Sequence, residues 1–414
     1  LPCLVDMTWR GVRVDQDRVE RTRNHLIKEE KATLAKIKHV AGQDVELWAA
    51  ASIAKAFDKL SIPYPRTEKN APSFTKSFLA DHPHELAQLI VRARNLNKTS
   101  GTFINTIMKH CHADGRIHGH INQIRSDDGG TVSGRISMSN PNLQQIPARD
   151  PELGPMIRSL FLPEEGEQWA AIDFSQQEPR ILVHYAYVYG RSRGAQMAGV
   201  EEFVTAYRED PDMDFHTMVA EMANIPRKQA KTINLGMMYG MGVNKLSDQL
   251  DIDVDEAKGL VGQYHDRVPF VKGLMNGVMN SLNSRGSSGS VRSILGRKCR
   301  FDLWEPATFA MHKALPYQDA IKEYGETTRL KRAYTYKALN RLIQASAADM
   351  TKQAMVNIYE QGRLPLVQIH DEIAMSVKNR EDANTIAEIM ENAVPLEIPS
   401  KCDVEIGPSW GEAS

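Results

Sequence analysis

Apolar and polar residues follow a helical period through most of the first third of the chain. Residues 16–41 carry apolar side chains at helical spacing among many charges, which predicts one long amphipathic helix. The same spacing predicts two more helices over 46–60 and 83–110, and three prolines within 61–73 predict a loop between them. Residues 1–14 are expected to be extended and to end in a turn. A block of helices is therefore expected near the start of the chain.

Strand-like patterns lie further along. Residues 116–121 show strand-like alternation, 169–173 (WAAID) form a short apolar run that ends in an acid, and 366–377 contain two apolar strand halves around a polar tip. Helices are expected over 177–189, most of 214–284 and 339–361. Strands and helices are therefore expected to be mixed along the rest of the chain.

The composition is that of a globular protein. With 414 residues, 42% hydrophobic and 25% charged, the chain suits two or three folding units, and disordered or fibrous classes are excluded. No apolar stretch approaches the ~18 residues of a membrane span, so no membrane partner is expected. Four widely spaced cysteines indicate a reducing compartment and argue against structural zinc. No secretion signal is recognised, and the missing initiator Met suggests a piece of a longer polypeptide.

Charge is divided unevenly along the chain. The formal net charge is −1, but residues 1–150 carry 22 Lys and Arg against 16 Asp and Glu, or +6, which leaves −7 for the rest. Such a division suits a protein whose basic part meets phosphates while acidic residues elsewhere hold metal. An ordinary solvated surface is the alternative, and charge alone favours it.

Two acids stand where apolar strands end. Asp173 closes the first strand, and Asp371 lies at the tip of the second pair, beside Glu372. Mg²⁺ takes oxygen ligands, commonly one or two carboxylates plus substrate phosphates. Two such acids on neighbouring strands would suit a two-metal phosphoryl-transfer site. The alternative is that each acid only caps a turn.

A second motif, RKQAKTINLGMMYGMG, begins at Arg227. Arg227, Lys231, Leu235 and Tyr239 follow one another at four-residue steps, which places them along one stripe of a helix. The cationic end of this stripe suits a triphosphate, and the apolar and aromatic end suits a base or sugar. An amphipathic helix with ordinary surface cations is the alternative.

A third segment, 133–149 (SGRISMSNPNLQQIPAR), is rich in Arg, Asn and Gln and contains two prolines. It cannot be one regular helix, because proline removes a backbone donor and clashes with the preceding turn. Its many side-chain donors suit minor-groove acceptors and phosphates. A polar loop is the alternative.

In their order along the chain, these motifs resemble those of family A DNA polymerases, the group of bacterial polymerase I and its phage and mitochondrial relatives. Residues 173–180 (DFSQQEPR) are similar to motif A, DYSQIELR. The segment from Arg227 fits motif B, RxxxKxxxFGxxYG, and 369–372 (IHDE) fit motif C, VHDE. Residues 133–149 match TGRxSSxxPNLQNIPxR, and the resemblance covers nearly the whole chain.

The resemblance implies an α+β fold shaped like a right hand, with a helical thumb, helical fingers and a palm whose antiparallel sheet carries both aspartates. The corresponding parts of this chain are 1–112 (N-terminal connector and thumb), 113–183 (first part of the palm), 184–336 (fingers) and 337–414 (second part of the palm). No 3′–5′ exonuclease is recognisable in this chain. An upstream exonuclease domain or a processivity factor would be a further partner.

The activity implied is template-directed addition of deoxynucleotides to a primer 3′-hydroxyl, with release of pyrophosphate, in DNA replication or repair. Asp173 and Asp371, with Glu372 beside them, would hold two Mg²⁺ ions, for which Mn²⁺ is a substitute. Lys231 would also donate a proton to pyrophosphate. The implied partners are primer-template DNA and dNTPs, in the cytoplasm of a bacterial or phage-infected cell and at its nucleoid.

Further site residues are implied by the same motifs. Glu178 would be the steric gate that rejects a ribose 2′-hydroxyl, and Tyr239 would stack near the template or the nascent base pair. The other implied nucleotide-binding residues are Arg227, Lys231, Leu235, His216 and Gln176. Primer or template contacts are implied for Arg135, Asn142, Gln144, Arg149, Arg180, Asn340, Gln344 and His370.

The sequence departs from the family pattern at several positions. Leu235 stands where motif B usually has an aromatic residue, which leaves open how nucleotides without a 3′-hydroxyl are treated. Phe174, Gln177 and Pro179 replace common motif A residues, and Gln145 replaces a frequent Asn. None of these changes removes an implied metal ligand.

Two rival functions stay open at this point. A single-subunit RNA polymerase shares the palm acids and a motif B, but a bulky Glu178 beside the sugar opposes ribonucleotides. A non-catalytic DNA-binding relative is the other rival, which the presence of Asp173, Asp371, Arg227 and Lys231 opposes.

Overall fold

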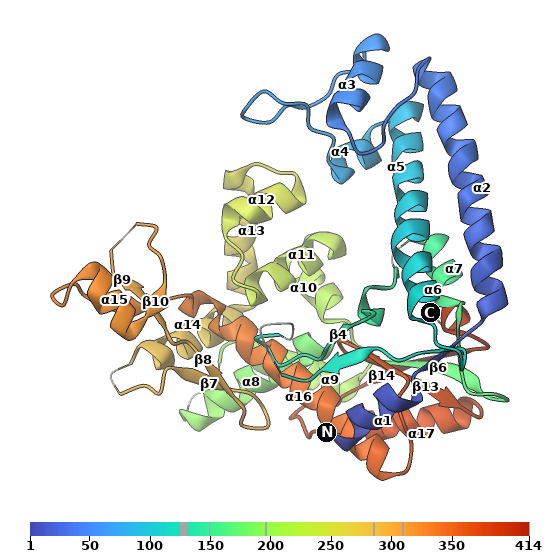
Figure 1. Ribbon diagram of the computed structural model, residues 1–414. Helices are drawn as coiled ribbons and strands as arrows, with labels where there is room; N and C mark the ends of the chain where they lie inside the picture. The colour runs from blue at the N-terminus through green and yellow to red at the C-terminus, as the bar shows by residue number, and fades with distance from the viewer. Residues whose placement is uncertain (125–130, 149, 195–196, 285, 309, 414) are drawn as a thin grey trace. The chain divides into compact units, whose positions relative to one another are not determined.

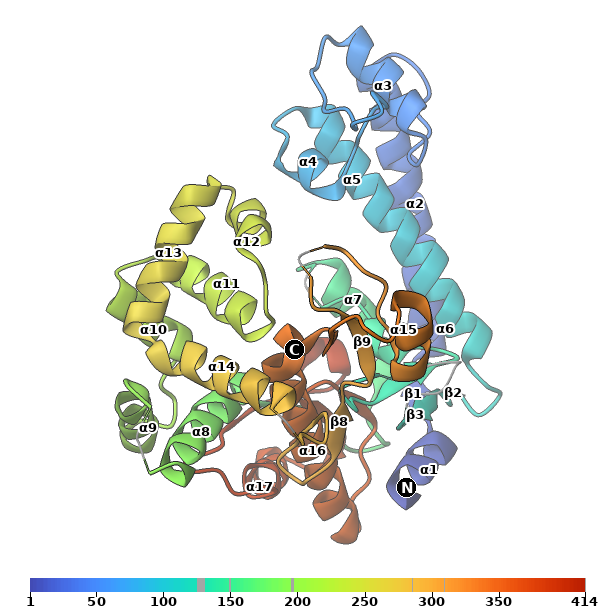
Figure 2. The ribbon, with the colours of Figure 1, turned by 90° about the vertical axis from the view of Figure 1, so that its left-hand side faces the viewer.

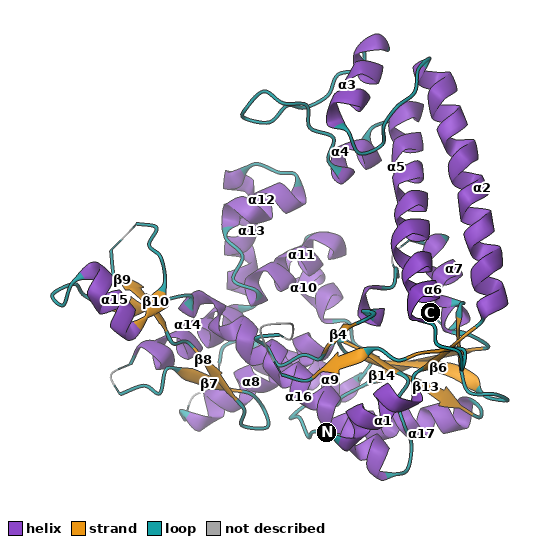
Figure 3. Cartoon of the chain, in the orientation of Figure 1, coloured by secondary structure: helices purple, strands orange, loops and turns teal. Residues whose placement is uncertain are grey.

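The computed structural model describes residues 1–124, 131–148, 150–194, 197–284, 286–308 and 310–413. Contacts divide the chain into two compact units, and Figure 3 shows helices and strands in both. The large unit combines Leu1–Met7, Ile121–Ser137 and Ala171–Glu405. The small unit combines Thr8–His120, Met138–Ala170 and Ile406–Ser414.

Two long helices, α2 (Gln16–Ala41) and α5 (Glu85–Lys98), lie side by side in the small unit (Figure 1). The Asp15 carboxylate caps α2 by accepting from the Arg18 amide at 2.8 Å, and Gly42 ends the helix with a left-handed φ of 63°. The helix predicted over 16–41 is therefore confirmed.

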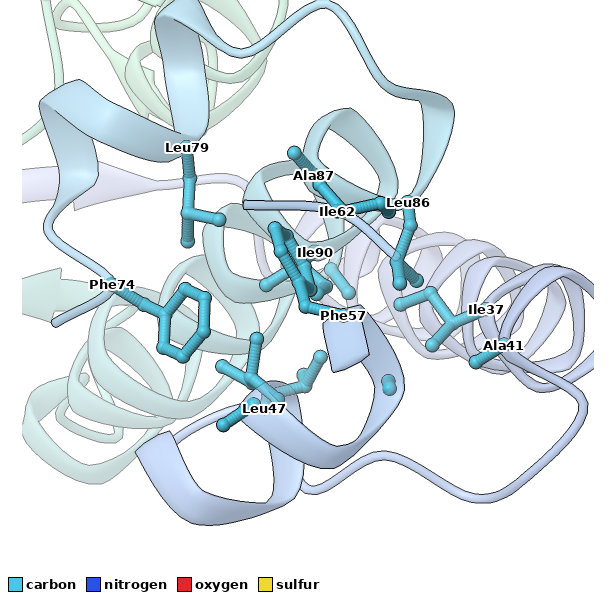
Figure 4. Close-up of a cluster of buried hydrophobic side chains, with 14 residues drawn as sticks. Ile37, Ala41, Leu47, Phe57, Ile62, Phe74, Leu79, Leu86, Ala87 and Ile90 are labelled. Carbon is cyan, nitrogen blue, oxygen red and sulfur yellow. The ribbon is translucent and has the colours of Figure 1, made fainter. Parts of the chain in front are cut away.

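An apolar cluster fills the tip of this helix pair (Figure 4). Phe57 on α3 (Ala50–Lys59) is fully buried and meets the Phe74 ring edge-on at 5.0 Å. The helix predicted over 46–60 begins only at Ala50, and the predicted loop is present. A short helix, α4 (Lys76–Asp81), was not predicted; the Thr75 hydroxyl caps it by accepting from the Phe78 amide.

The predicted helix over 83–110 is interrupted. After α5 the backbone passes through a π-helical turn, η1 (Thr99–Ile104), before α6 (Asn105–His110). The small unit also contains a three-stranded sheet in the order β2-β1-β5, whose strand β1 precedes α2 in the chain. The remaining elements of the small unit are β1 (Val12–Val14), β2 (Arg116–Ile117), β5 (Phe161–Leu162), α7 (Leu153–Arg158), and the 3₁₀ turns η2 (Leu143–Gln145) and η4 (Trp410–Glu412).

The prediction of an extended start over 1–14 is wrong for most of that segment. Residues Pro2–Arg10 form helix α1, and only Val12–Val14 are extended. Cys3 and Met7 are buried four residues apart, which is the spacing of one helical face. Pro2 opens the helix at its first position, where proline is tolerated. The helix was not predicted because its apolar pattern is too short to show a helical period.

A four-stranded sheet in the order β12-β13-β6-β14 lies mainly in the large unit. Its strands are β6 (Gln168–Phe174), β12 (Val367–Ile369), β13 (Glu372–Val377) and β14 (Cys402–Gly407). The predicted WAAID strand and the predicted strand pair are therefore confirmed. Helices α16 (Ala338–Glu360) and α17 (Arg380–Glu391) pack against β13.

The prediction that 214–284 is mostly helical is also confirmed. Figure 2 shows α10 to α14 gathered in one group, and α10 packs against both α11 and α13. The helices that run through this part of the large unit are α8 (Gln177–Ser192), α9 (Val200–Glu209), α10 (Phe215–Ala223), α11 (Arg227–Met238), α12 (Val243–Leu250), α13 (Val254–Arg267) and α14 (Pro269–Asn283).

Short strands follow α14 and precede α16. A hairpin, β7 with β8, is followed by a three-stranded sheet in the order β10-β9-β11. These elements are β7 (Ser290–Arg292), β8 (Lys298–Arg300), β9 (Leu303–Pro306), β10 (Leu315–Pro316), α15 (Tyr317–Tyr324), β11 (Leu330–Arg332) and the 3₁₀ turn η3 (Thr335–Lys337). The strand predicted over 116–121 is split between β2 and β3 (His120–Asn122), which pairs with β4 (Ser137–Ser139).

Candidate active site

The two predicted acids lie near each other where neighbouring strands of the four-stranded sheet end or begin. Asp173 lies near the end of β6, the strand between β13 and β14. Asp371 lies in the two-residue turn between β12 and β13, where Ile369 pairs with Glu372. The Phe174 amide donates to the Asp371 carbonyl at 3.3 Å. Two carboxylates about 200 positions apart in the chain are thereby brought near each other, and we call the cluster of Asp173, Asp371 and Glu372 the acidic pocket.

The pocket concentrates negative charge in a poorly hydrated place. Burial, together with the nearby carboxylates of Asp371 and Glu372, raises the pKa of Asp173 to about 8. Burial also raises the pKa of Asp371. The Asp173 Oδ1 atom is buried and has no hydrogen-bond partner among the described residues. These carboxylates are therefore held together at a cost that a bound cation would relieve.

The pocket fits a divalent cation that shares its ligands with a substrate. Within the described ranges, no cluster of three or more His, Cys, Asp or Glu side chains has the geometry of a complete metal site. Mg²⁺ does not need one, because it commonly takes one or two carboxylates and completes its shell with water and phosphate oxygens. The orphaned Asp173 oxygen is the observation that favours such an ion.

Glu178 is held from two sides beside this pocket. It lies in the first turn of α8, and Arg135 donates to its Oε1 atom at 2.6 Å while the Tyr239 hydroxyl donates to its Oε2 atom at 2.7 Å. Burial nevertheless raises the pKa of Glu178, against the lowering effects of Tyr239 and Arg135. The structure thus brings together three residues that the sequence placed in separate motifs.

The loop that carries Arg135 is held by a residue to which sequence reasoning assigned no role. Arg297 donates to the Ser133 carbonyl at 2.8 Å, to the Ala345 carbonyl at 2.9 Å and to the buried Asp349 carboxylate at 2.9 Å. Gly134 allows this approach, because a Cβ atom there would lie 2.5 Å from the guanidinium. The signal in the sequence is the LGRK stretch at 295–298, which contains Arg297 and resembles a family segment.

On α11 the predicted stripe is present, and its first member is already paired. Arg227 donates to the Asp214 carboxylate at 2.6 Å and to the Thr217 hydroxyl at 3.1 Å. Burial would raise the pKa of Asp214, but the hydrogen bonds from Arg227 and Thr217 lower it to about 2. Lys231 is exposed one turn further along, and Leu235 is half-buried.

His216 is buried behind α11. Its Nδ1 atom lies 2.9 Å from the Asn234 side-chain amide. Burial lowers the pKa of His216 to about 4, and the nearby charge of Lys231 acts in the same direction. The imidazole is therefore neutral near pH 7 and can meet a phosphate only as a hydrogen-bond partner.

Arg180 and Gln176 make internal contacts. Arg180 is only 2% exposed, and its guanidinium donates to the carbonyls of Ser175, Pro399 and Pro211. The Gln176 side chain bridges to α10, accepting from the Phe215 amide at 2.8 Å. Both side chains fix the start of α8, which positions Glu178.

The remaining predicted residues fall in several places. His370 has a left-handed φ of 57° in the turn before Asp371, and Asn340 lies one helical turn before Gln344 on α16. The Gln344 side chain is hydrogen-bonded to the Tyr239 hydroxyl. Asn142 and Gln144 lie in the small unit, where the Asn142 carbonyl oxygen of the side chain caps η2. Arg149 lies outside the described residues.

Comparison with known proteins identifies the class of this fold. The family model for DNA polymerase family A matches residues 16–412. In the structural comparison, the POL domain of Pol1 from M. smegmatis, solved in complex with DNA primer-template and dNTP, superposes with a TM-score of 0.76. It is 27% identical, and the match covers 100% of this chain and 69% of that one.

Two sequence relatives place the chain more closely. A DNA-directed DNA polymerase of Pseudomonas phage M6 is 37% identical over 100% of this chain and 65% of its own length. The thermostable DNA polymerase I of Thermus filiformis is 30% identical over 99% of this chain and 47% of its own length. The chain thus spans about two thirds of the phage relative and about half of the bacterial one. It belongs to DNA polymerase family A.

This result confirms the resemblance and the α+β polymerase fold expected from the motifs. Enzymes of this family generally use divalent metal ions. None of the described helices is both long enough and apolar enough to cross a membrane. The residue assignments and the thumb, palm and finger boundaries stay predictions.

Proposed function

We propose that this chain is a template-directed DNA polymerase that adds deoxynucleotides to a primer 3′-hydroxyl and releases pyrophosphate. One observation carries the proposal: Asp173 and Asp371 share a pocket in which an Asp173 oxygen lacks a hydrogen-bond partner among the described residues. Family membership supports it, as do the names of the matched polymerases. Primer-template DNA and dNTPs are the proposed substrates.

The carboxylates of Asp173 and Asp371, with Glu372 beside them, would hold two Mg²⁺ ions, or Mn²⁺ in their place. When bound, such ions polarise phosphate oxygens and favour ionisation of the attacking hydroxyl. Asp173 lies on β6 and Asp371 lies in the turn that leads into the neighbouring strand β13, so the sheet fixes their separation before substrate arrives. Rigid placement lowers the reorganisation needed in the transition state.

The α11 stripe would bind the triphosphate. Asp214 and Thr217 orient the Arg227 guanidinium, which has further N–H groups for phosphate oxygens. Lys231, exposed on the same face, would neutralise charge on the leaving pyrophosphate and donate its proton there. His216 would add a neutral hydrogen bond.

Glu178 would act as the gate against ribonucleotides. Its carboxylate is fixed by Arg135 and Tyr239, so it cannot swing away freely from a sugar placed beside it. This rigidity favours a DNA polymerase over the rival single-subunit RNA polymerase. Arg135, Asn340, Gln344 and His370 would contact the primer or template around it.

The assignment of the remaining parts follows the same proposal. The helices of 1–112 would form the thumb and those of 184–336 the fingers, with the palm in 113–183 and 337–414. Asn142, Gln144, Arg149 and Arg180 would support the primer or template, Arg180 indirectly. Because the matched relatives come from bacteria and phages, we place the enzyme in the cytoplasm, at the nucleoid.

Primer extension tests this function. The wild-type chain is expected to extend a primer with all four dNTPs when Mg²⁺ or Mn²⁺ is present and to stop when the ions are chelated. Ribonucleotides are expected to be incorporated poorly, and Glu178→Ala to improve their use by about 10- to 200-fold, the range for removing one steric contact. Extension that is indifferent to divalent ions would overturn the proposal. The same assay with 3′-deoxy analogues measures the consequence of Leu235.

A further inference from the structure

Helix α11 buries a polar residue among apolar ones. Asn234 is fully buried, and Ala230, Ile233 and Met238 on the same helix are buried too. Lys231, one turn earlier, is exposed. A polar side chain in such surroundings loses its hydration and needs hydrogen bonds to replace it. The contacts of Asn234 therefore indicate why a polar residue stands at this position.

The Asn234 side chain faces His216 on α10. Its Nδ2 atom lies 2.9 Å from the Nδ1 atom of the His216 ring. Its Oδ1 atom is buried and has no hydrogen-bond partner among the described residues. A buried acceptor without a partner destabilises a fold, whereas an apolar side chain of the same size would not. Packing alone therefore does not explain this asparagine.

The ring of His216 is uncharged near pH 7. Burial lowers the pKa of His216 to about 4, with the charges of Lys231 and Arg227 acting in the same direction and that of Asp214 opposing them. A neutral ring carries one proton, either on Nδ1 or on Nε2. The two forms differ in which ring nitrogen can donate a hydrogen bond to a ligand.

The Asn234 amide selects between these two forms. Because its Nδ2 atom is a donor, the Nδ1 atom that faces it accepts, and the proton lies on Nε2. The Nε2 atom has no hydrogen-bond partner among the described residues, and His216 keeps 6% of its surface exposed. Lys231 and Arg227 lie near enough to lower the pKa of the ring. An N–H group beside two cations suits an anionic ligand.

We propose that Asn234 is a positioning residue that fixes the proton of His216 on Nε2, so that the ring donates a hydrogen bond to the triphosphate of a bound dNTP. The inference rests on the proposed polymerase function, because that function brings a triphosphate to α11. With the proton on Nδ1, the ring would instead turn a lone pair toward the phosphate oxygens and repel them. Asn234 is fully buried, so it acts only through His216.

Nitrogen NMR of the His216 ring tests the proposal without catalysis. The chain is labelled with ¹⁵N at histidine, and His216→Gln identifies the signals of this ring by their loss. In the wild type at pH 7, Nε2 is expected to be protonated and Nδ1 unprotonated. Asn234→Asp keeps the size of the side chain but offers only acceptors, so Nδ1 is expected to become protonated. A proton on Nδ1 in the wild type would overturn the proposal.

A double-mutant cycle tests the effect on the nucleotide. Asn234→Leu removes the donor at similar volume and is expected to weaken dNTP binding by about tenfold, as for one lost hydrogen bond to a charged acceptor, with the maximum rate changed less than about twofold. In a His216→Gln background, the same substitution is expected to change dNTP affinity by less than about twofold. Single-turnover extension at varied dNTP concentrations measures both quantities. A tenfold loss in both backgrounds would contradict the proposal, because Asn234 would then act independently of His216.

Controls separate this role from folding and from the proposed function. Asn244→Leu, at an exposed asparagine on α12, is expected to leave dNTP affinity and melting temperature unchanged. If Asn234→Leu does not fold, the ring spectrum of the wild type still decides. Inorganic triphosphate is expected to shift the His216 Nε2 signal of the wild type, and the absence of a shift would refute the inference. A shift in a chain that extends no primer would support the inference and count against the proposed function.

Discussion

The tip of the helix pair in the small unit and the acidic pocket in the large unit bury side chains with opposite energetic consequences. At the tip, Phe57, Leu79 and Ile90 are fully buried in apolar surroundings (Figure 4), and each such side chain contributes about 1.5–3 kcal/mol. In the pocket, burial works against the charged forms of Asp173 and Asp371. The tip stabilises its own fold, whereas the pocket depends on the surrounding sheet to hold it together.

The substitution Asp371→Asn tests the functional role of the acidic pocket. Loss of one carboxylate is expected to lower primer extension by at least about 10³-fold, because several kcal/mol of charge stabilisation disappear. Without divalent ions, the melting temperature is expected to stay the same or rise, since a like-charge repulsion is removed. Single-turnover extension and thermal melting measure the two effects. Asp248→Asn, at an exposed acid on α12, serves as the control; near wild-type extension by Asp371→Asn would refute the assigned role.

The substitution Phe57→Ala tests how much the apolar cluster stabilises the small unit. Removing this fully buried ring is expected to lower the free energy of unfolding of the small unit by about 3–5 kcal/mol through lost burial and a residual cavity. Urea unfolding followed by circular dichroism measures the change. Lys55→Ala, at an exposed position of the same helix, is expected to stay within about 0.5 kcal/mol. Equal effects of the two substitutions would show that the cluster does not stabilise this tip.

The substitution Arg297→Met tests whether one guanidinium supports both the stability of the large unit and the positioning of Arg135. It leaves the Asp349 carboxylate and two carbonyls without their charged donor, with an expected cost of about 2 kcal/mol. Because Arg297 holds the loop before Arg135, ribonucleotide discrimination is expected to weaken as well. Competition between dNTPs and rNTPs measures this, and Arg297→Lys is expected to recover part of it. Unchanged discrimination with lowered stability would limit Arg297 to a purely structural role.

Substitution of Asp214 is expected to change stability least, and the change is expected to depend on pH. Asp214→Ala removes both the cap of α10 and the partner of Arg227, at an expected cost of about 1 kcal/mol near pH 7, while Asp214→Asn keeps the cap. Since the pKa of Asp214 falls from 3.8 to about 2 in the folded protein, its charge contributes stability above pH 3.8 that is lost as the pH falls toward 2. Melting temperatures from pH 2 to 7 are expected to converge with those of Asp214→Asn at the acid end. A difference that persists at pH 2 would contradict the assignment.

Local patterns predicted long elements well. The apolar period over Gln16–Ala41 matched α2 at both ends, because a strong N-cap and a C-terminal glycine coincide with the ends of that period. The short apolar run at WAAID was recognisable as a strand since its residues are buried on both faces. Helix α1 and the π-helical turn η1 were missed, because each depends on packing within a segment too short to show a period.

The order of the motifs, through its resemblance to family A DNA polymerases, was enough to predict the family and its α+β fold. The structure brings Asp173 and Asp371 close together, and their role as metal ligands stays a prediction. The sequence did not show that Arg135, Glu178 and Tyr239 would bond to one another, that Arg297 would hold the loop before Arg135, or that Arg180 would be buried. Those contacts join segments that are dozens of residues apart along the chain. Only the packed tertiary structure brings such side chains within hydrogen-bonding distance, because a pattern along the chain carries no information on which distant groups become neighbours.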